Sequence, residues 1–408
     1  MLTVAEAQAI VLQHARPLPP QVRPLTPAAL GAVLAEDVAS DLDMPPFDKA
    51  LMDGYAVRSA DLPEGSGTLT VVEEITAGRA PEKSLAAGQA ARIMTGAPMP
   101  DCADAVVMVE RTQLLDGGRV RVDDRPAKPG QNMQKRGQEM RRGETVLTAG
   151  SVLRPQEFGL LASVGRRSAK LYPQPAVSIL VTGDELVETE QLPGPGQIRN
   201  SNGPVLAAQV ARAGGVPRSL GIAPDRIESL RSLVAEGLKA SILVLSGGVS
   251  AGKLDLVPEV LQELGVAPHF HKVAMKPGKP VFFGARGETL VFGLPGNPVS
   301  ALVCFELFVC PALRRLAGHA QVGPFLVQAL LADNFPYRTD RPTYHPARLE
   351  ETETGRQVRP VPWLGSPDLR GLTRANAFLV LPVGDLVHRA GEAYPVLTVE
   401  DCGTRFQS

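Results

Sequence analysis

The chain has no excess of charge of either sign. Its 408 residues include 42 basic and 43 acidic ones, for a formal net charge of −1. A balanced charge provides no overall field that would attract nucleic acid or an anionic membrane. We therefore expect local sites to select the partners, with neither nucleic acid nor a membrane among them.

Long apolar runs and an export signal are also missing. No run of about 18 uncharged apolar residues occurs, the length that a membrane-spanning helix requires. The first residues, Met1 to Glu6, contain no basic segment followed by an apolar one, as a secretory signal would. These absences predict a cytoplasmic protein.

Cysteine is scarce, and its spacing excludes common roles. None of the four cysteines forms a C-x-x-C pair, and all lie in apolar or terminal contexts. That pattern favours reduced packing residues over zinc ligands or disulfides. The cysteines are Cys102, Cys304, Cys310 and Cys402.

The first 50 residues are expected to be helical and then extended. Thr3 and Glu6 form a capping-box signature that predicts a helix to about His14. A second short helix is expected over 27–34. The consecutive prolines at 45–46 exclude both a helix and a central strand, so the chain around them should be irregular.

Short β-like segments separated by turn residues follow and predict a small all-β module. A helix from 154 to about 163, with Pro155 at its start and Gly165 after its end, then interrupts this pattern. The β-like segments are 68–73, 90–93, 105–109, 120–122 and 145–147.

From residue 176 to 316 strands alternate with helices, which predicts a mostly parallel, doubly wound α/β sheet. Beyond Pro324 the pattern is β-like again, with 378–381 and 395–399 as the clearest strands. The expected fold class is thus multidomain α/β plus β. In the α/β segment we expect strands at 177–181 and 242–245 and near 273, 281 and 291, and helices at 204–213, 226–238, 256–264 and 298–316.

Glycine-rich or lysine-bearing loops adjoin three apolar strands of this segment. Strand 242–245 runs into Ser246 to Gly252, strand 290–292 runs into Gly293 to Pro298, and Lys276 to Lys279 precedes strand 281–283. In open α/β sheets ligands bind at the carboxyl ends of strands, and glycine lets backbone N–H groups approach an anion. We therefore predict an anion-binding α/β protein.

The first of these loops satisfies the P-loop spacing G-x-x-x-x-G-K from Gly247 to Lys253. Leu254 follows it, however, where a nucleotide triphosphatase needs Ser or Thr for magnesium, so a Walker-type ATPase is not expected. A tight strand-to-helix turn is one alternative. The other is an anion site in which Asp255 holds a divalent metal and Ser246, Gly247, Gly248 and Ser250 supply N–H and hydroxyl donors.

Acidic residues are expected to gather near strand ends. Asp184 and Glu185 follow the first strand of the segment, and Asp225 precedes the expected helix at 226. Each has a simple alternative as a helix cap. Together with Asp255, however, they would place several carboxylates near one edge, which indicates Mg²⁺ or an adenosine hydroxyl as ligand.

Two further loops suggest bound anions. Lys276 and Lys279 place two ammonium groups on a proline-stiffened turn, which would hold a pyrophosphate or an oxyanion unless the turn is merely exposed. Asn297 as N-cap and Pro298 as first helical residue would leave N–H groups pointing outward at the positive end of a helix. Capping alone is the alternative for that pair.

Taken in order, these segments resemble the MoeA/gephyrin family, the molybdopterin molybdenumtransferases. The resemblance runs from about Thr3 to the C-terminus. It rests on Pro45 to Asp48 with Met52-Asp-Gly-Tyr-Ala56, Ile93 to Pro100, Thr182 to Leu186, Gly196 to Asn202, Ser246 to Ser250 with Asp255, Lys276 to Pro280, and Gly293 to Ser300.

The resemblance implies an enzyme that completes molybdenum cofactor synthesis. Adenylylated molybdopterin would be bound, molybdate inserted at its dithiolene, and AMP released in a Mg²⁺-dependent step. The resemblance also implies a homodimer with a composite active site, and transient contacts with the adenylyltransferase and with molybdoenzymes. The implied domains are 1–50 with 149–172 (helical and extended), 51–148 (small β), 173–322 (α/β, molybdopterin-binding) and 323–408 (C-terminal β).

Site residues follow from the motifs and the resemblance together. We expect a catalytic set in which Asp53 and Thr95 come from the other protomer, and in which Asp225 and Asp255 hold the metal. The expected catalytic residues are Asp53, Thr95, Glu185, Asp225 and Asp255. The expected substrate-binding residues are Thr182, Gly183, Asp184, Ser201, Asn202, Ser246, Gly247, Gly248, Ser250, Lys276, Lys279, Pro295, Gly296, Asn297 and Ser300.

One segment departs from the family pattern. Many members read Asn-Ser-Ala where this chain has Lys49-Ala50-Leu51, so a hydroxyl is missing beside Asp53. Two alternative functions are a molybdopterin adenylyltransferase, which shares the α/β domain but typically lacks the flanking segments, and a gephyrin-like scaffold, which carries an additional N-terminal domain. The length and the first helix of this chain favour the molybdenumtransferase.

Overall fold

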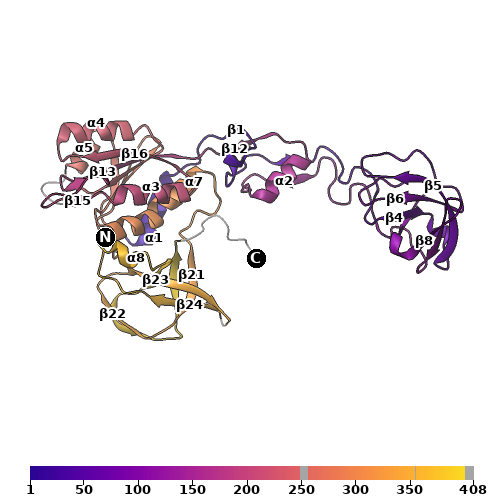
Figure 1. The fold of residues 1–408 in the computed structure, drawn as a ribbon. Helices are drawn as coiled ribbons and strands as arrows, with labels where there is room; N and C mark the ends of the chain where they lie inside the picture. Colours follow the sequence, from indigo (N-terminus) through magenta and orange to yellow (C-terminus); the bar gives the residue numbers. More distant parts are fainter. Residues whose placement is uncertain (249–255, 354, 400–408) are drawn as a thin grey trace. The chain divides into compact units, whose positions relative to one another are not determined.

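The computed structural model describes residues 1–248, 256–353 and 355–399 (Figure 1). Contacts divide the chain into two compact units. The first unit consists of residues 1–36, 150–154 and the chain from 168 on, and the second of 37–149 and 155–167. The finer division into four domains stays a prediction.

The first unit is built on a six-stranded sheet of order β16-β13-β17-β20-β19-β18. The first four strands are mutually parallel, whereas β19 and β18 form an antiparallel edge. Every residue of β17 is buried, which is typical of a parallel strand covered on both faces. The strands are β13 (Ala176–Thr182), β16 (Val216–Ala223), β17 (Ile242–Ser246), β18 (Ala267–Phe270), β19 (Phe282–Arg286) and β20 (Thr289–Leu294).

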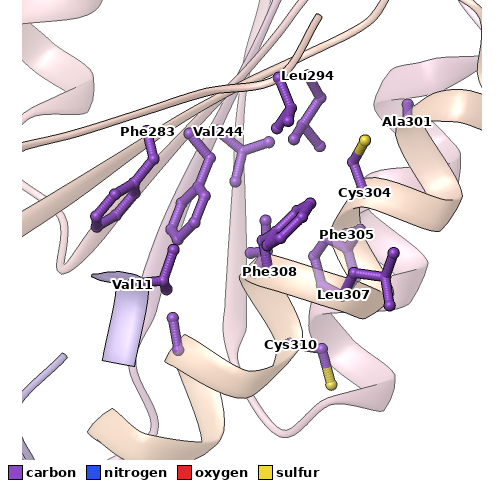
Figure 2. Packing of buried hydrophobic residues seen from close by; sticks show 14 of the residues in the cluster. Val11, Val244, Phe283, Leu294, Ala301, Cys304, Phe305, Leu307, Phe308 and Cys310 are labelled. Atoms are coloured by element: carbon purple, nitrogen blue, oxygen red, sulfur yellow. The ribbon is translucent and has the colours of Figure 1, made fainter. Parts of the chain in front are cut away.

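Helices cover both faces of this sheet, which confirms the doubly wound α/β prediction. On one face Val244 and Phe283 share a core with Val11, Phe305 and Phe308 (Figure 2). On the other face Leu243 and Leu245 pack with α4 and α5. The first face is covered by α1 (Val4–His14), α3 (Asn202–Arg212), α6 (Pro298–Cys304) and α7 (Cys310–Leu316), and the second by α4 (Ile227–Gly237) and α5 (Val257–Glu263).

The first helix is capped as predicted. The Thr3 hydroxyl accepts a hydrogen bond from the Glu6 N–H at 3.2 Å, and the Glu6 carboxylate accepts one from the Thr3 N–H at 2.8 Å. The helix expected over 27–34 was wrong: only a 3₁₀ turn, Pro27–Ala29, forms, and Gly31 follows it at φ +79°. A left-handed residue ends a helical path.

Three further differences have simple causes. Strand β16 was missed because its first four residues are exposed and Pro217 and Gly221 interrupt the pattern. No strand forms near 273, where Val273 makes only an isolated bridge with Leu2. The helix expected over 298–316 contains a π-helical turn, Phe305–Val309, just before Pro311, whose missing N–H interrupts the regular ladder.

The C-terminal part of this unit is a closed β-barrel of order β21-β24-β23-β25-β27. The strands expected at 378–381 and 395–399 are β25 and β27. A short helix, α8 (Leu369–Leu372), and the hairpin partners β22 (Phe335–Thr339) and β26 (Gly384–His388) accompany the barrel. The barrel strands are β21 (Leu326–Leu331), β23 (Thr343–Thr352), β24 (Gly355–Pro360), β25 (Ala377–Leu381) and β27 (Ala393–Thr398).

The second unit holds another six-stranded sheet, of order β7-β4-β6-β5-β9-β8, with an apolar core on each face. The expected strand at 145–147 is β11 (Thr145–Leu147), but it pairs with β2 (Val38–Ala39) and not with the main sheet. Helix α2 (Pro155–Ser163) forms as predicted. The main-sheet strands are β4 (Gly54–Val57), β5 (Ser66–Ile75), β6 (Gln89–Ile93), β7 (Ala105–Met108), β8 (Thr112–Leu115) and β9 (Arg119–Asp123).

Candidate active site

A cavity of about 720 Å³ lies at the carboxyl ends of β13, β17 and β20. It is called the edge cavity below. It gathers most of the residues that the sequence motifs indicated, although they come from segments far apart in the chain. The predicted residues that line it are Thr182, Gly183, Glu185, Ser201, Asn202, Asp225, Ser246, Gly247, Gly248, Pro295, Gly296 and Asn297. Two others, Ser250 and Asp255, lie outside the described residues.

Asn202 ties the walls of the edge cavity together. Its Nδ2 donates to Ser246 Oγ at 2.8 Å and to the Gly296 carbonyl at 2.7 Å, which links α3 to the ends of β17 and β20. Asn202 Oδ1 and Thr182 Oγ1 are buried and have no hydrogen-bond partner among the described residues. Buried polar atoms are normally paired, so both oxygens are suited to a ligand or a bound water.

Glycine is required where the loop after β17 turns. Gly247 has φ +94°, and a Cβ there would lie 2.4 Å from the Thr182 carbonyl oxygen. Gly248 has φ +60°, and a Cβ there would lie 2.8 Å from Thr182 Oγ1. A side chain at either position would force the loop away from β13, so glycine is required here by the close approach of the loop to Thr182.

Carboxylates line one side of the edge cavity. Glu185 and Asp225 belong to the lining, whereas Asp184 does not and accepts a hydrogen bond from the Asp225 N–H at 3.0 Å. Asp225 is not the cap of α4, because Arg226 occupies the N-cap position. Among the residues that the structure describes, no group of three or more His, Cys, Asp or Glu is placed to hold a metal. Two carboxylates with substrate phosphates are nevertheless a usual ligand set for Mg²⁺.

A second cavity, of about 490 Å³, adjoins the edge cavity and is called the basic cavity. Pro280, Pro295 and Asn297 line both. Lys276, Lys279 and Arg341 line the basic cavity, and no carboxylate lines it within residues 1–248, 256–353 and 355–399. The other lining side chains include Ser300, Ser366, Tyr337, His345 and Trp363.

The strand order explains how the lysines reach this place. Strand β19 runs antiparallel to β20, and Phe282 pairs with Gly293. The loop before β19 therefore lies at the edge where β20 ends. Lys276 is half-buried with its Nζ 5.5 Å from the centre of the Tyr337 ring, whereas Lys279 is exposed. The predicted site residues are thus divided between two neighbouring cavities, one lined by acids and glycine loops and one lined by Lys276, Lys279 and Arg341.

His345 is the most buried titratable residue that lines the basic cavity. Burial, and then the positive charge of Lys276, lower its pKa, although its hydrogen bond to the Pro346 carbonyl acts in the opposite direction. His345 Nδ1 lies 2.9 Å from that carbonyl oxygen. The ring is therefore neutral at pH 7, and the charge of the cavity comes from its lysines and arginine.

The start of α6 differs from the expectation. Asn297 is the N-cap, but its side chain makes no capping hydrogen bond; its Nδ2 donates to Ser366 Oγ at 2.9 Å. The Val299 N–H donates to the Ser366 carbonyl at 3.1 Å. Part of the expected outward-facing N–H array is therefore occupied by a loop that leads to the barrel, and an anion at this end of α6 would meet Ser366 as well as the helix.

Three family models match successive parts of the chain. A MoeA N-terminal region (domain I and II) matches residues 2–165, a probable molybdopterin binding domain matches 178–315, and a MoeA C-terminal region (domain IV) matches 328–399. A molybdopterin molybdenumtransferase of Bacillus subtilis (strain 168) is 35% identical over 380 residues, covering 91% of this chain and 88% of the relative. The chain belongs to the MoeA family of molybdopterin molybdenumtransferases.

Other relatives agree with this membership. A molybdopterin molybdenumtransferase of Staphylococcus aureus (strain Mu50) is 34% identical over 378 residues, covering 91% of this chain and 90% of the relative. The crystal structure of the molybdopterin biosynthesis MoeA protein from Pyrococcus horikoshii OT3 has a TM-score of 0.82 at 30% identity, covering 98% of this chain and 100% of that one. The predicted family, its fold class and an enzyme of molybdenum cofactor biosynthesis are confirmed.

Several cavity-lining residues were not predicted from the sequence as site residues. Arg199 lines the edge cavity, and Arg341, Ser366 and Trp363 line the basic one. Arg341 stands in a polar Thr-Asp-Arg-Pro turn, which marks a loop but does not indicate that the loop faces Lys276. Arg341, Ser366 and Trp363 could not be predicted because the sequence does not indicate how the barrel and its loops pack against the loops of this MoeA-family α/β fold.

Asp53 and Thr95 are paired within the second unit. Both the N–H and the hydroxyl of Thr95 donate to Asp53 Oδ1, each at 2.7 Å. These hydrogen bonds, the backbone one first, hold the pKa of Asp53 below its usual value. The result is a fixed, ionised carboxylate on an exposed surface. Leu51, two residues earlier in the chain, is also exposed.

The described part of the chain contains no helix that is both long enough and apolar enough to cross a membrane.

Proposed function

We propose that this chain inserts molybdate into adenylylated molybdopterin and releases AMP. The observation that supports this most strongly is the adjacency of the two cavities, which share Pro280, Pro295 and Asn297. One cavity suits a nucleotide-bearing phosphoanhydride and the other suits a free oxyanion. An insertion reaction requires both ligands side by side.

The edge cavity would take the adenylylated substrate. The loop at Gly247 and Gly248 lets backbone N–H groups approach phosphate oxygens, and the apolar side chains of Leu186, Ile198 and Leu230 offer a surface for a flat ring. The unpaired oxygens of Thr182 and Asn202 would accept hydrogen bonds from the substrate. These residues bind and orient; none of them has to react.

The basic cavity would take molybdate. A tetrahedral dianion needs positive charge and hydrogen-bond donors, and Lys276, Lys279 and Arg341 supply both. The sequence alone suggested the two lysines for a pyrophosphate or an oxyanion. Their separation from the acid-bearing edge cavity favours the oxyanion.

Magnesium fits the acid-bearing side of the edge cavity. Asp225 lines it and is one of the two predicted metal ligands; Asp255, the other, lies outside the described residues, and Glu185 offers a further carboxylate. A bound magnesium ion supplies neutralisation of charge on the phosphates as the anhydride is cleaved. The residues of this chain hold and align the substrate for that cleavage, and the backbone N–H groups near Gly247 stabilise negative charge on its oxygens.

The proposal includes an assembly and a location. A homodimer would complete the site, with Asp53 and Thr95 supplied by the second protomer, in a protein of the cytoplasm. The ionised carboxylate of Asp53 is suited to orienting a group of the substrate or its metal. The proposal also includes the four-domain division. It further includes transient contacts with the adenylyltransferase and with molybdoenzymes.

Single-turnover measurements test the proposal. The purified chain is mixed with adenylylated molybdopterin, molybdate and Mg²⁺, and both AMP and pterin-bound molybdenum are quantified. We expect AMP and molybdenum incorporation in equal amounts, both dependent on molybdate. Lys272→Ala, an exposed position outside both cavities, is the matched control and should behave as the wild type. AMP formation without molybdenum incorporation would exclude insertion as the reaction.

A further inference from the structure

A loop of the C-terminal domain, residues 361–368, is fixed against α6 by hydrogen bonds. Ser366 accepts a hydrogen bond from the Val299 N–H at 3.1 Å through its carbonyl, and from Asn297 Nδ2 at 2.9 Å through its hydroxyl. The Asp368 carboxylate accepts from the N–H groups of Leu364 at 3.1 Å and Gly371 at 2.8 Å. The loop is therefore held at Leu364, Ser366 and Asp368, directly after Trp363.

This loop carries Trp363, the single tryptophan of the chain, into the lining of the basic cavity. The indole packs edge-on against His345, with ring centroids 5.3 Å apart and an interplanar angle of 84°. Its Nε1–H is buried and has no acceptor in the part of the chain that the structure describes. An indole nitrogen is a donor only, and a buried donor normally has a partner.

The chemistry of the cavity indicates which acceptor is missing. Lys276, Lys279 and Arg341 also line it, and they too are donors only. Asp340 is adjacent in sequence to Arg341 but does not belong to the lining, and its carboxylate is engaged with the Arg341 guanidinium at 3.2 Å. A ligand that offers several acceptor oxygens and no protons would satisfy all of these donors together.

We propose that the Nε1–H of Trp363 donates a hydrogen bond to an oxygen of a tetrahedral oxyanion bound by Lys276, Lys279 and Arg341. This inference rests on the proposed function in one respect, the placing of molybdate in the basic cavity. It adds a neutral, rigidly held donor from the C-terminal domain. The lysines and the arginine attract the anion, and the indole fixes its orientation.

Intrinsic fluorescence provides a direct test, because Trp363 is the only tryptophan. Molybdate, and separately tungstate, are titrated into the wild-type protein without any pterin substrate. We expect a saturable change in indole emission whose midpoint agrees with the dissociation constant from calorimetry. Binding that leaves the emission unchanged would overturn the contact.

Substitution tests the hydrogen bond itself. Trp363→Phe keeps an aromatic ring against His345 and removes the N–H, and it should weaken molybdate binding by about tenfold or more, because hydrogen bonds to charged groups are the stronger ones. AMP binding and the thermal unfolding temperature should stay close to the wild-type values. Leu364→Ala, on the same loop but 92% exposed and outside both cavities, is the control and should bind molybdate normally.

Lys279→Ala distinguishes the placement of molybdate in the basic cavity from the hydrogen bond that Trp363 would donate to it. If Lys279→Ala weakens molybdate binding while Trp363→Phe does not, the role of Trp363 is refuted and the basic cavity keeps its ligand. If neither substitution changes binding, molybdate does not occupy this cavity, and the placement within the proposed function fails as well. If Trp363→Phe lowers the unfolding temperature and weakens AMP binding to the same extent as molybdate binding, the indole has a packing role only and the inference is overturned.

Discussion

The backbone of Lys276 is paired with that of Thr343 in a parallel bridge. The Lys276 N–H donates to the Pro342 carbonyl at 2.9 Å, and the Lys276 carbonyl accepts from the Tyr344 N–H at 2.7 Å. Lys276 belongs to the loop before β19, and Thr343 begins strand β23 of the barrel. The barrel therefore fixes the backbone position of Lys276 in the α/β fold. An anion bound at Lys276 would lie next to both the α/β fold and the barrel.

The two lysines should matter for the oxyanion and little for the nucleotide. Lys276→Ala and Lys279→Ala should each weaken molybdate binding by roughly tenfold or more, since each removes a positive charge within a few ångströms of a dianion. AMP binding, in the edge cavity, should change much less. Calorimetric titration of each variant with molybdate and with AMP measures both effects, with Lys272→Ala as the control. An equal loss for both ligands would instead assign the lysines to the phosphates.

Glycine should be indispensable at position 247 and replaceable at 296. Gly247→Ala would place a Cβ 2.4 Å from the Thr182 carbonyl at φ +94°, so it should destabilise the protein by about 1–3 kcal/mol and disturb the edge cavity. Gly296→Ala meets its nearest heavy atom at 3.8 Å and should leave the unfolding free energy nearly unchanged. Denaturant unfolding of both variants makes the comparison. Equal stabilities would mean that the turn after β17 relaxes freely.

The pairing of Asp53 with Thr95 should be visible as a function of pH. Two hydrogen bonds to one oxygen lower the pKa of Asp53 in the folded protein. Their stabilising effect is therefore fully present above the ordinary Asp pKa of about 3.9, and it is lost as the pH falls through the lower folded value. Thr95→Val keeps the backbone donor and removes the hydroxyl, so the pKa of Asp53 should rise part of the way toward its ordinary value.

Carboxyl NMR titration of the wild type, Thr95→Val and Thr95→Ser measures this directly. Thr95→Ser retains both donors and should resemble the wild type. Thermal unfolding should separate Thr95→Val from the wild type at pH 7 and bring the two together as the pH falls below the folded-state pKa of Asp53. An Asp53 pKa that is unchanged in Thr95→Val would show that the hydroxyl does not contribute.

Local patterns in the sequence were sufficient for the elements and motifs that depend on neighbours in the chain. The Thr3 capping box, the apolar strand β17 and the glycine turn at 247–248 are all decided within a few residues. Strand β16 was missed because it is an edge strand with exposed side chains and therefore has no apolar strand pattern of its own. Its backbone is held in the sheet by pairing with β13.

Long-range docking could not be predicted in the same way. The location of the edge cavity could be predicted because the carboxyl ends of parallel strands meet at one edge of a sheet. This arrangement brings Thr182, Ser246 and Pro295 together independently of the loop conformations. The basic cavity depends on a barrel loop reaching α6 through Ser366, and no local pattern indicates that contact. The same contact explains why the start of α6 is less open than its Asn-Pro sequence suggested.

Asn202 should be the most sensitive polar residue of the edge cavity. It is 7% exposed, and its Nδ2 bonds both Ser246 Oγ and the Gly296 carbonyl. Asn202→Ala removes two hydrogen bonds and leaves buried acceptors unpaired, which should cost about 1–3 kcal/mol. Asn202→Asp should be worse above pH 7, because a carboxylate would face the Gly296 carbonyl oxygen at the place where an amide now donates to it.

Thermal unfolding and AMP titration of the two variants test this ordering. The deficit of Asn202→Asp relative to Asn202→Ala should shrink as the pH is lowered, since protonation turns the carboxylate into a donor for the same carbonyl. AMP affinity should fall in both, because α3 and the loops after β17 and β20 would no longer be joined. If Asn202→Asp were as stable as the wild type at every pH, the amide would not be the donor that holds these walls.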